Sequence, residues 1–295
     1  MSVGSWRRGL AFLAAGTTTA VVRGLLDGQA PGGAARWTRT NHRGEPVSML
    51  EGPAVAAGVL AGSLVGAPSV RGAWALGVAT SSAAVFGVVD DLAEDVSSRR
   101  KGLRGHLGAL AHGELTTGGL KVLGIGAGAL VAAALATPRR RGGAVVGPGA
   151  WTADVLASGA LIATSANLVN LLDLRPGRAL KASAMVAAPL AVGGGQAGSG
   201  AGAACAVLGA GAAALDQDLD EADMLGDGGA NALGAALGTA VVLAAPRGVR
   251  LTLLAGVVAL TVISEKVSFT RVIERTPVLR DIDAWGRRPV EPAGR

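Results

Sequence analysis

The sequence predicts an all-α fold, a polytopic membrane helix bundle with about nine transmembrane helices. Half of the 295 residues are apolar, only 16% are charged and the mean hydropathy is +0.45, which is more apolar surface than one soluble domain normally buries. The 47 glycines favour closely packed membrane helices, because small residues let helix backbones approach each other in lipid. We therefore expect a single integral membrane domain over residues 1–295.

The expected spans are apolar stretches bounded by charges or by Gly/Pro clusters. They cover residues 8–26, 51–67, 72–89, 118–136, 151–172, 179–194, 199–215, 228–245 and 249–266. The sixth and seventh stretches could instead form one re-entrant unit. Arg7 and Arg8 precede the first stretch, but no clean small-residue cleavage site follows it, so we expect a retained span.

The distribution of Lys and Arg predicts the orientation of these spans. Alternate connections place 17 of them on one side, in 27–50, 90–117, 173–181, 215–228 and the tail from residue 266, and 8 on the other. The richer side is expected to be cytoplasmic, with Arg139, Arg140 and Arg141 as the main contrary evidence. Basic residues flank apolar segments without a dense stripe of interleaved aromatics, so the net charge of +6 does not predict nucleic-acid binding.

The first polar cluster is the pair Asp90 and Asp91, which ends the apolar stretch 72–89. Two adjacent carboxylates at a membrane boundary cost free energy unless a cation or a hydrogen-bond donor compensates them. The alternative is a helix end whose carboxylates face water.

A second cluster ends the stretch 151–172. Asn167, Asn170 and Asp173 are spaced three apart, so on a helix they form one polar stripe. Hydrogen bonding between helices is the alternative use of such amides. The stripe leads into three basic residues that could bind phosphate or anionic lipid headgroups: Arg175, Arg178 and Lys181.

The third cluster is an acidic loop, Asp216 to Asp223, most of which is expected to be solvated. Asp227 differs, because glycines on both sides let the backbone approach a ligand at the start of the stretch 228–245. A carboxylate there suits a hard cation such as Mg²⁺, and a phosphate would interact with the positive end of the helix. The three histidines lack metal-site spacing and are interpreted as structural or surface residues. The single Cys205 excludes an internal disulfide.

All these clusters fall on the side expected to be cytoplasmic. Paired aspartates, a carboxylate among glycines, amides and basic residues at a membrane surface favour Mg²⁺-assisted phosphoryl transfer to or from a lipid. No Walker loop, dinucleotide-binding glycine pattern or Ser-His-Asp order competes with this interpretation.

Four segments, taken in order, resemble the polyprenyl-phosphate N-acetylhexosamine-1-phosphate transferases, the family that includes phospho-N-acetylmuramoyl-pentapeptide transferase. They are Val88-Val89-Asp90-Asp91-Leu92, Lys101-Gly102-Leu103, Ala166 through Asp173, and Met224 through Gly238. The loop Asn41 to Val47 is also similar, so the resemblance covers about residues 41–285.

The resemblance implies transfer of a sugar-1-phosphate from a nucleotide sugar, such as a UDP-sugar, to a polyprenyl phosphate with Mg²⁺. The reaction would take place at the cytoplasmic face of a bacterial plasma membrane, in synthesis of cell-envelope glycans. Asp90 and Asp91 match the family's catalytic aspartate pair, and Asp227 matches its principal magnesium ligand. The substrate-binding residues implied by the motifs and their flanks are Lys101, Asn167, Asn170, Asp173, Arg175 and Lys181.

The sequence also departs from the family pattern. Glu94 stands where a lysine is common, Pro176 where a second aspartate is usual, and the C-terminal histidine-rich loop is missing. These departures favour, as the alternative, a catalytically silent relative that binds polyprenyl lipid or scaffolds envelope-assembly enzymes. A small transporter is a weaker alternative, because charged residues are scarce within the spans. A homodimer is compatible with the sequence.

Overall fold

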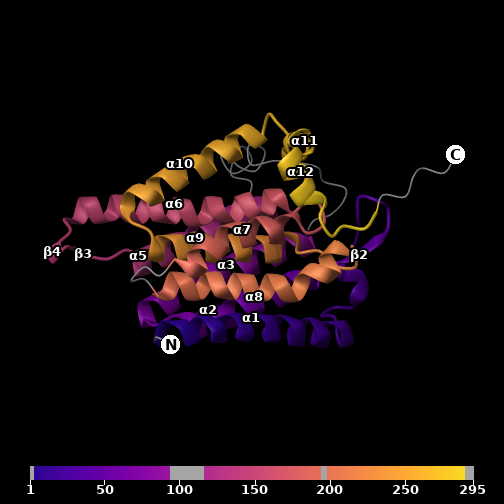
Figure 1. Ribbon diagram of the computed structural model, residues 1–295, viewed down its shortest axis with the longest axis horizontal. Helices are drawn as coiled ribbons and strands as arrows, with labels where there is room; N and C mark the ends of the chain where they lie inside the picture. Colours follow the sequence, from indigo (N-terminus) through magenta and orange to yellow (C-terminus); the bar gives the residue numbers. More distant parts are fainter. Residues whose placement is uncertain (1–2, 94–115, 194–197, 290–295) are drawn as a thin grey trace.

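The computed structural model describes residues 3–93, 116–193 and 198–289, and this part of the chain folds into eleven α-helices and two short hairpins. Most of the helices run side by side along the long axis of the molecule (Figure 1). Each of the nine predicted stretches coincides with one helix, so the all-α expectation is confirmed. These helices are α1 (Val3–Gly28), α2 (Glu51–Gly66), α3 (Val70–Ala93), α5 (Thr117–Ala136), α6 (Pro148–Leu172), α7 (Arg178–Val192), α8 (Gly198–Leu219), α9 (Gly226–Ala244) and α10 (Arg247–Ser264).

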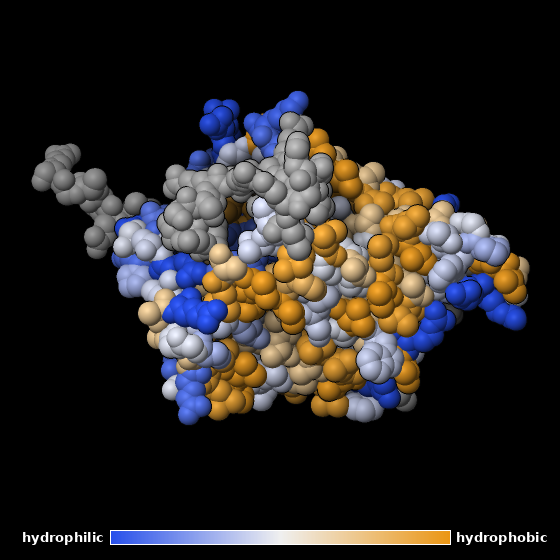
Figure 2. Space-filling view, turned by 180° about the vertical axis from the view of Figure 1, so that it is seen from behind, coloured by the Kyte–Doolittle hydropathy of each residue, from blue (hydrophilic) through white to orange (hydrophobic). Residues whose placement is uncertain are grey.

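Six of these helices are long and apolar enough to cross a membrane: α1 from Ser5 onward, α3, α5, α6, α8 and α10. With 16 and 15 residues, α2 and α7 are shorter than the roughly 20 residues that span a hydrocarbon core. From behind, an apolar surface band lies between hydrophilic ends (Figure 2). The described chain therefore has the features of a multi-pass membrane protein.

Helix α9 forms the centre of the bundle, and 16 of its 19 residues are buried. It packs against α3, α6, α8 and α2. Glycines permit this packing: a Cβ at Gly87 of α3 would lie 2.5 Å from the backbone oxygen of Asp227, and one at Gly234 would lie 2.4 Å from that of Ser165. These close approaches fix where α9 begins, next to the end of α3.

The Gly87→Val variant is expected to unfold at a lower temperature than the wild type. Every near neighbour of the new Cβ is backbone, so the helices must separate, which costs about 1–3 kcal/mol. Gly126→Val in α5 is the matched control, because a Cβ there has nothing within 4 Å. Thermal melts of the two variants in the same detergent test this, and equal melting temperatures would contradict it.

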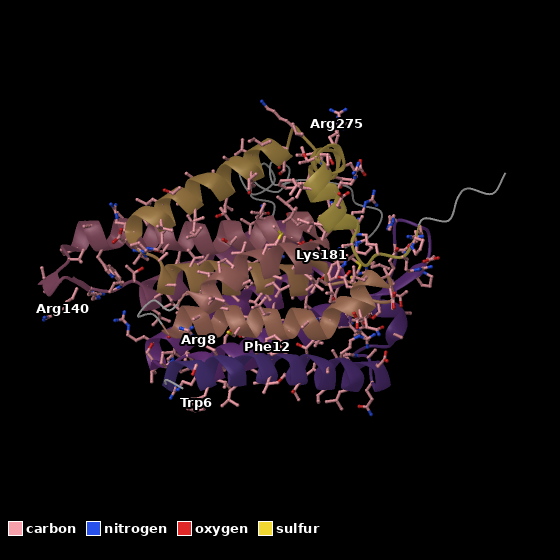
Figure 3. The ribbon with its side chains drawn as sticks, in the orientation of Figure 1. Trp6, Arg8, Phe12, Arg140, Lys181 and Arg275 are labelled. Carbon is pink, nitrogen blue, oxygen red and sulfur yellow. The ribbon has the colours of Figure 1, made fainter. Side chains whose placement is uncertain are left out.

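The two ends of the bundle carry different short elements. One end, here called the site end, holds the hairpin of β1 (Thr38–Thr40) and β2 (Pro46–Ser48), preceded by a 3-10 turn at Ala34–Trp37, and the helices α11 (Phe269–Arg275) and α12 (Pro277–Ala284). The opposite end holds the hairpin of β3 (Arg140–Arg141) and β4 (Ala144–Val145). Figure 3 labels Arg140 there, well separated from Lys181 and Arg275. Neither hairpin was predicted from the sequence, because both are too short for a strand periodicity.

Candidate functional site

Helix α9 begins at the site end with its amide groups directed at a carboxylate of α3. The backbone N–H groups of Asp227 and Gly228 donate to the two carboxylate oxygens of Asp91, at 3.0 and 2.9 Å. Amides in the first turn of a helix have no partner within that helix, and the helix dipole favours a negative charge beside them. Gly226 makes this approach feasible, with φ of +58° and a hypothetical Cβ only 3.0 Å from Asp91 Oδ2. Asp91 is thereby held in place as a cap on α9.

A lysine of α5, Lys121, joins two further carboxylates, those of Asp90 and Asp227. The ammonium group of Lys121 lies 2.5 Å from Asp90 Oδ2 and also bonds to Asp227 Oδ2. Its side chain is 19% exposed, so a cation in this position faces both carboxylates in a partly desolvated setting. Three helices far apart in the sequence thus meet around one positive charge.

Lys121 is not among the site residues predicted from the sequence. An ionisable residue within an apolar span is costly and usually functional, and that rule alone would have identified it.

A fourth acidic side chain, Asp173, follows the last residue of α6 and accepts a hydrogen bond from the Gly226 amide. Burial raises the pKa of Asp173 well above its ordinary range, and the nearby carboxylates of Asp218, Asp227 and Asp91 act in the same direction. The structure therefore brings Asp90, Asp91, Asp173 and Asp227 into one region at the start of α9.

Replacing Asp173 with Asn is expected to stabilise the protein increasingly as the pH rises. An acid whose pKa is raised by folding keeps its proton in the folded chain and loses it in the unfolded chain, so stability falls from about pH 4 up to the folded pKa. In thermal melts between pH 4 and 9, the melting temperature of the variant minus that of the wild type should increase as the pH rises. The exposed Asp216→Asn is the control. A constant difference between Asp173→Asn and the wild type would contradict the prediction.

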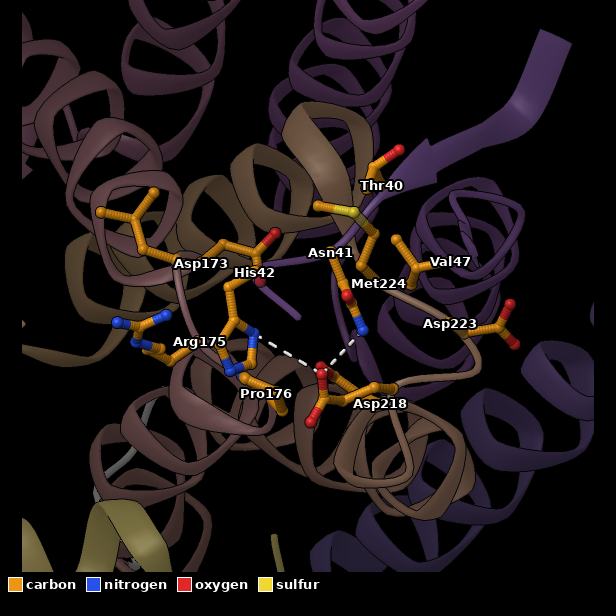
Figure 4. Close-up of a pocket in the computed structure, with 12 residues that line it drawn as sticks. Thr40, Asn41, His42, Val47, Asp173, Arg175, Pro176, Asp218, Asp223 and Met224 are labelled. Atoms are coloured by element: carbon orange, nitrogen blue, oxygen red, sulfur yellow. Dashed lines mark hydrogen bonds and ion pairs between the residues drawn. The ribbon is translucent and has the colours of Figure 1, made fainter. Parts of the chain in front are cut away.

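Beside Asp173 lies a cavity of about 210 Å³, lined also by the loop before α2 and the loop after α8. Figure 4 shows two contacts at its wall: Asn41 Nδ2 donates to Glu221 Oε2 at 2.8 Å, and His42 Nδ1 lies 3.5 Å from the same oxygen. Burial lowers the pKa of His42, and this outweighs the attraction of Glu221. A neutral imidazole, an amide and the guanidinium of Arg175 therefore line a polar cavity next to the carboxylates.

The expectation that most of the acidic loop is solvated is wrong. Asp218, Glu221 and Asp223 are at most 5% exposed. Arginines from distant segments neutralise two of these three side chains: Arg23 of α1 makes a bidentate pair with Asp223, at 2.7 and 2.8 Å, and Arg43 bonds to Glu221 at 2.7 Å. Glu221 itself has φ of +59°, a strained conformation held by these contacts.

The remaining predicted residues have different surroundings. Asn167 and Asn170 lie in the last turns of α6, and neither side chain bonds to another described residue. The ammonium group of Lys181 donates to the carbonyl oxygens of Asp283, at 2.9 Å, and of Trp285, at 2.5 Å. Arg178 forms a bidentate pair with Asp283. Helix α12 thus contacts the basic residues expected to bind phosphate.

Lys101 and Glu94 lie outside the described residues, as do His106 and His112.

Within the described ranges, no three or more His, Cys, Asp or Glu side chains are arranged to hold a metal ion on their own. Two carboxylates, those of Asp90 and Asp227, do converge on a single cation. Magnesium is commonly bound by one or two carboxylates together with phosphate oxygens of a substrate. The donor set is therefore compatible with Mg²⁺ accompanied by a phosphate ligand.

Comparison of the chain with models of known protein families gave no match, and comparison with curated proteins gave none.

Proposed function

We propose that the protein is a Mg²⁺-dependent transferase that moves a sugar-1-phosphate from a nucleotide sugar to a polyprenyl phosphate. The observation that carries this proposal is the convergence of Asp90 and Asp227 on one cation at the N-terminus of a buried helix. The resemblance of the motifs around these residues to the polyprenyl-phosphate transferases supports it independently.

In this proposal Asp90 and Asp227 would hold Mg²⁺, which would neutralise charge on the phosphates. Asp91 fixes the geometry, because both of its oxygens are occupied by amides of α9. Lys121 provides a further positive charge for a phosphate entering between the carboxylates. The cavity beside Asp173 and Arg175 would accept the nucleotide.

The proposal includes nine membrane-spanning helices, with the site end at the cytoplasmic face of a bacterial plasma membrane. The excess of Lys and Arg at this end supports the orientation. The shorter α2 and α7 would cross the bilayer within the bundle, where neighbouring helices shield them from lipid.

Exchange of labelled UMP into a UDP-sugar tests the proposed reaction. Purified full-length protein, a polyprenyl phosphate and Mg²⁺ should give exchange, and omission of either the lipid or the metal should abolish it. If a panel of nucleotide sugars and their matching labelled nucleotides gives no exchange, the proposal is wrong.

A catalytically silent relative that binds polyprenyl lipid or scaffolds envelope enzymes is the second candidate. It is favoured by the contacts of α12: Arg178 and Lys181 both bond to Asp283 of this helix, so these two basic side chains already have partners within the chain. Calorimetry separates the two candidates: the enzyme should bind a uridine nucleotide in a Mg²⁺-dependent manner, whereas a scaffold should show no binding heat.

A further inference from the structure

The net positive charge of the chain is concentrated at the end opposite the site, where Figure 3 labels Trp6, Arg8 and Arg140. This end consists of the first residues of α1, α3, α6, α8 and α10, the last residues of α2, α5, α7 and α9, and the β3–β4 hairpin. Its described segments contain eight arginines: two in α1, one in α3, three at 139–141 and two in α10. They contain one acid, Asp154, so this end has a net charge of +7, whereas the whole chain has +6. The rest of the chain is therefore close to neutral.

The single acid is paired away from the surface. Asp154 is 3% exposed and accepts a hydrogen bond from Arg247 Nε at 2.6 Å. One turn later in α10, the buried Arg250 donates to Ser158 Oγ at 2.8 Å. These contacts fasten the start of α10 to the start of α6. Asp154 consequently leaves the charge of the exposed arginines uncompensated.

Three arginines of this end lie on the surface beside apolar side chains. Arg71, Arg139 and Arg140 are exposed, and none of them pairs with a carboxylate within the described ranges. Val145, which pairs with Arg140 across the hairpin, is 72% exposed, and Val70, next to Arg71, is 74% exposed. A valine beside an arginine fits the boundary of the hydrocarbon, because the apolar group stays in lipid while the guanidinium reaches the headgroups.

Tryptophans occur at the same level of the bundle. Three of the five in the chain are here: Trp6, Trp74 and Trp151. Trp6 is 47% exposed and Trp74 is 63% exposed. The guanidinium of Arg139 lies 4.1 Å from the centre of the Trp151 ring, and that of Arg7 lies 5.7 Å from the Trp6 ring. Tryptophan is enriched at the headgroup level of membrane proteins, so these rings indicate where the lipid phosphates lie.

We propose that the opposite end binds anionic phospholipids of the surrounding leaflet, with headgroup phosphates at Arg71, Arg139 and Arg140. A guanidinium can bind a phosphate through two parallel hydrogen bonds. A net charge of +7 favours a headgroup with a net negative charge over a zwitterionic one. The tryptophans and exposed valines favour a lipid over a soluble polyanion, because a polyanion offers them no apolar contact. This inference goes beyond the proposed function and does not depend on it.

Spin-labelled phospholipids measure this preference. The full-length protein is reconstituted in phosphatidylcholine vesicles with a trace of phosphatidylglycerol or phosphatidylcholine that carries a nitroxide on its acyl chain. The EPR spectrum gives the fraction of each labelled lipid that the protein immobilises. At low salt the wild type should immobilise phosphatidylglycerol several-fold more strongly than phosphatidylcholine. The ratio should decrease in about 1 M NaCl, where the screening length is only about 3 Å.

The triple variant Arg71→Gln, Arg139→Gln and Arg140→Gln should lower this ratio by about fivefold, because basic residues near the membrane surface supply the attraction for anionic lipids. Glutamine keeps a long polar side chain but lacks the charge. Should the triple variant fail to fold, the single variant Arg140→Gln, in an exposed hairpin position, should lower the ratio in the same direction.

The matched control removes three exposed arginines from the site end: Arg36→Gln, Arg271→Gln and Arg275→Gln. This variant has the same net charge as the first triple variant. Because acidic residues balance the arginines of the site end, the lipid ratio should stay within about twofold of the wild type, as for most surface substitutions.

Three results would overturn the inference. The wild type could immobilise the two lipids equally, or the two triple variants could lose the same preference, which would reduce the effect to net charge. Third, soluble poly(glycerol phosphate) could bind the wild type and abolish its lipid preference, which would identify an anionic polymer as the partner. Immobilisation of lipid requires no turnover, so a protein without UMP exchange can still show the preference, and a protein without the preference can still catalyse exchange.

Discussion

Asp227→Asn is expected to lower the rate of UMP exchange by about 10²–10³-fold, the usual effect of removing one electrostatic partner of a developing charge. Asp227 is one of two carboxylates that face Lys121, and its own amide donates to Asp91. The amide side chain of Asn keeps the size of Asp but lacks the charge, so affinity for Mg²⁺ should fall while α9 stays in position. Initial rates at several Mg²⁺ concentrations measure this, and the variant should require more metal for half-maximal rate.

Asp216→Asn is the control for this experiment. Asp216 is an acid of the same end of the bundle, but it is exposed on α8. Its loss changes the net charge by the same amount and should leave exchange within about twofold of the wild type, as for most surface substitutions. Equal losses in the two variants would mean that the general negative charge of this end matters, and the specific role of Asp227 would be refuted.

The helices were predictable from the sequence, because apolar stretches and their polar boundaries recur along the chain. The start of α9 illustrates this: glycines around Asp227 mark the helix start, and they also permit the approach of Asp91. Asn167 and Asn170 lie in the last turns of α6, as predicted, and Asp173 follows the last residue of this helix. For Asp173 the structure adds a bond to the Gly226 amide.

Contacts between distant segments were not predictable in the same way. Sequence spacing contains no information that Arg23 would neutralise Asp223, 200 residues later, so the acidic loop was wrongly expected in water. The same holds for α12, whose Asp283 reaches Arg178. The preference of a lone charge for a partner is a general rule, but the identity of the partner depends on which helices become neighbours.

Lys121→Met is expected to destabilise the protein by about 3 kcal/mol at neutral pH, because removal of one member of a largely buried ion pair leaves the other charges uncompensated. The carboxylates of Asp90 and Asp227 would then face each other without a cation. The melting temperature in detergent should drop by several degrees. Lys266→Met, an exposed lysine that follows α10, is the control and should melt like the wild type.

A second measurement is the change in melting temperature that Mg²⁺ causes in the wild type and in Lys121→Met. In the wild type, Lys121 and Mg²⁺ compete for the same two carboxylates unless a phosphate joins them, so the metal alone should raise the melting temperature little. In Lys121→Met the cation position is free, and a metal at 100 times its Kd would restore about 2.7 kcal/mol. A variant that melts low and gains nothing from Mg²⁺ would show that the two carboxylates accept a lysine but no metal. That result would leave the lipid-binding scaffold as the better explanation of the site.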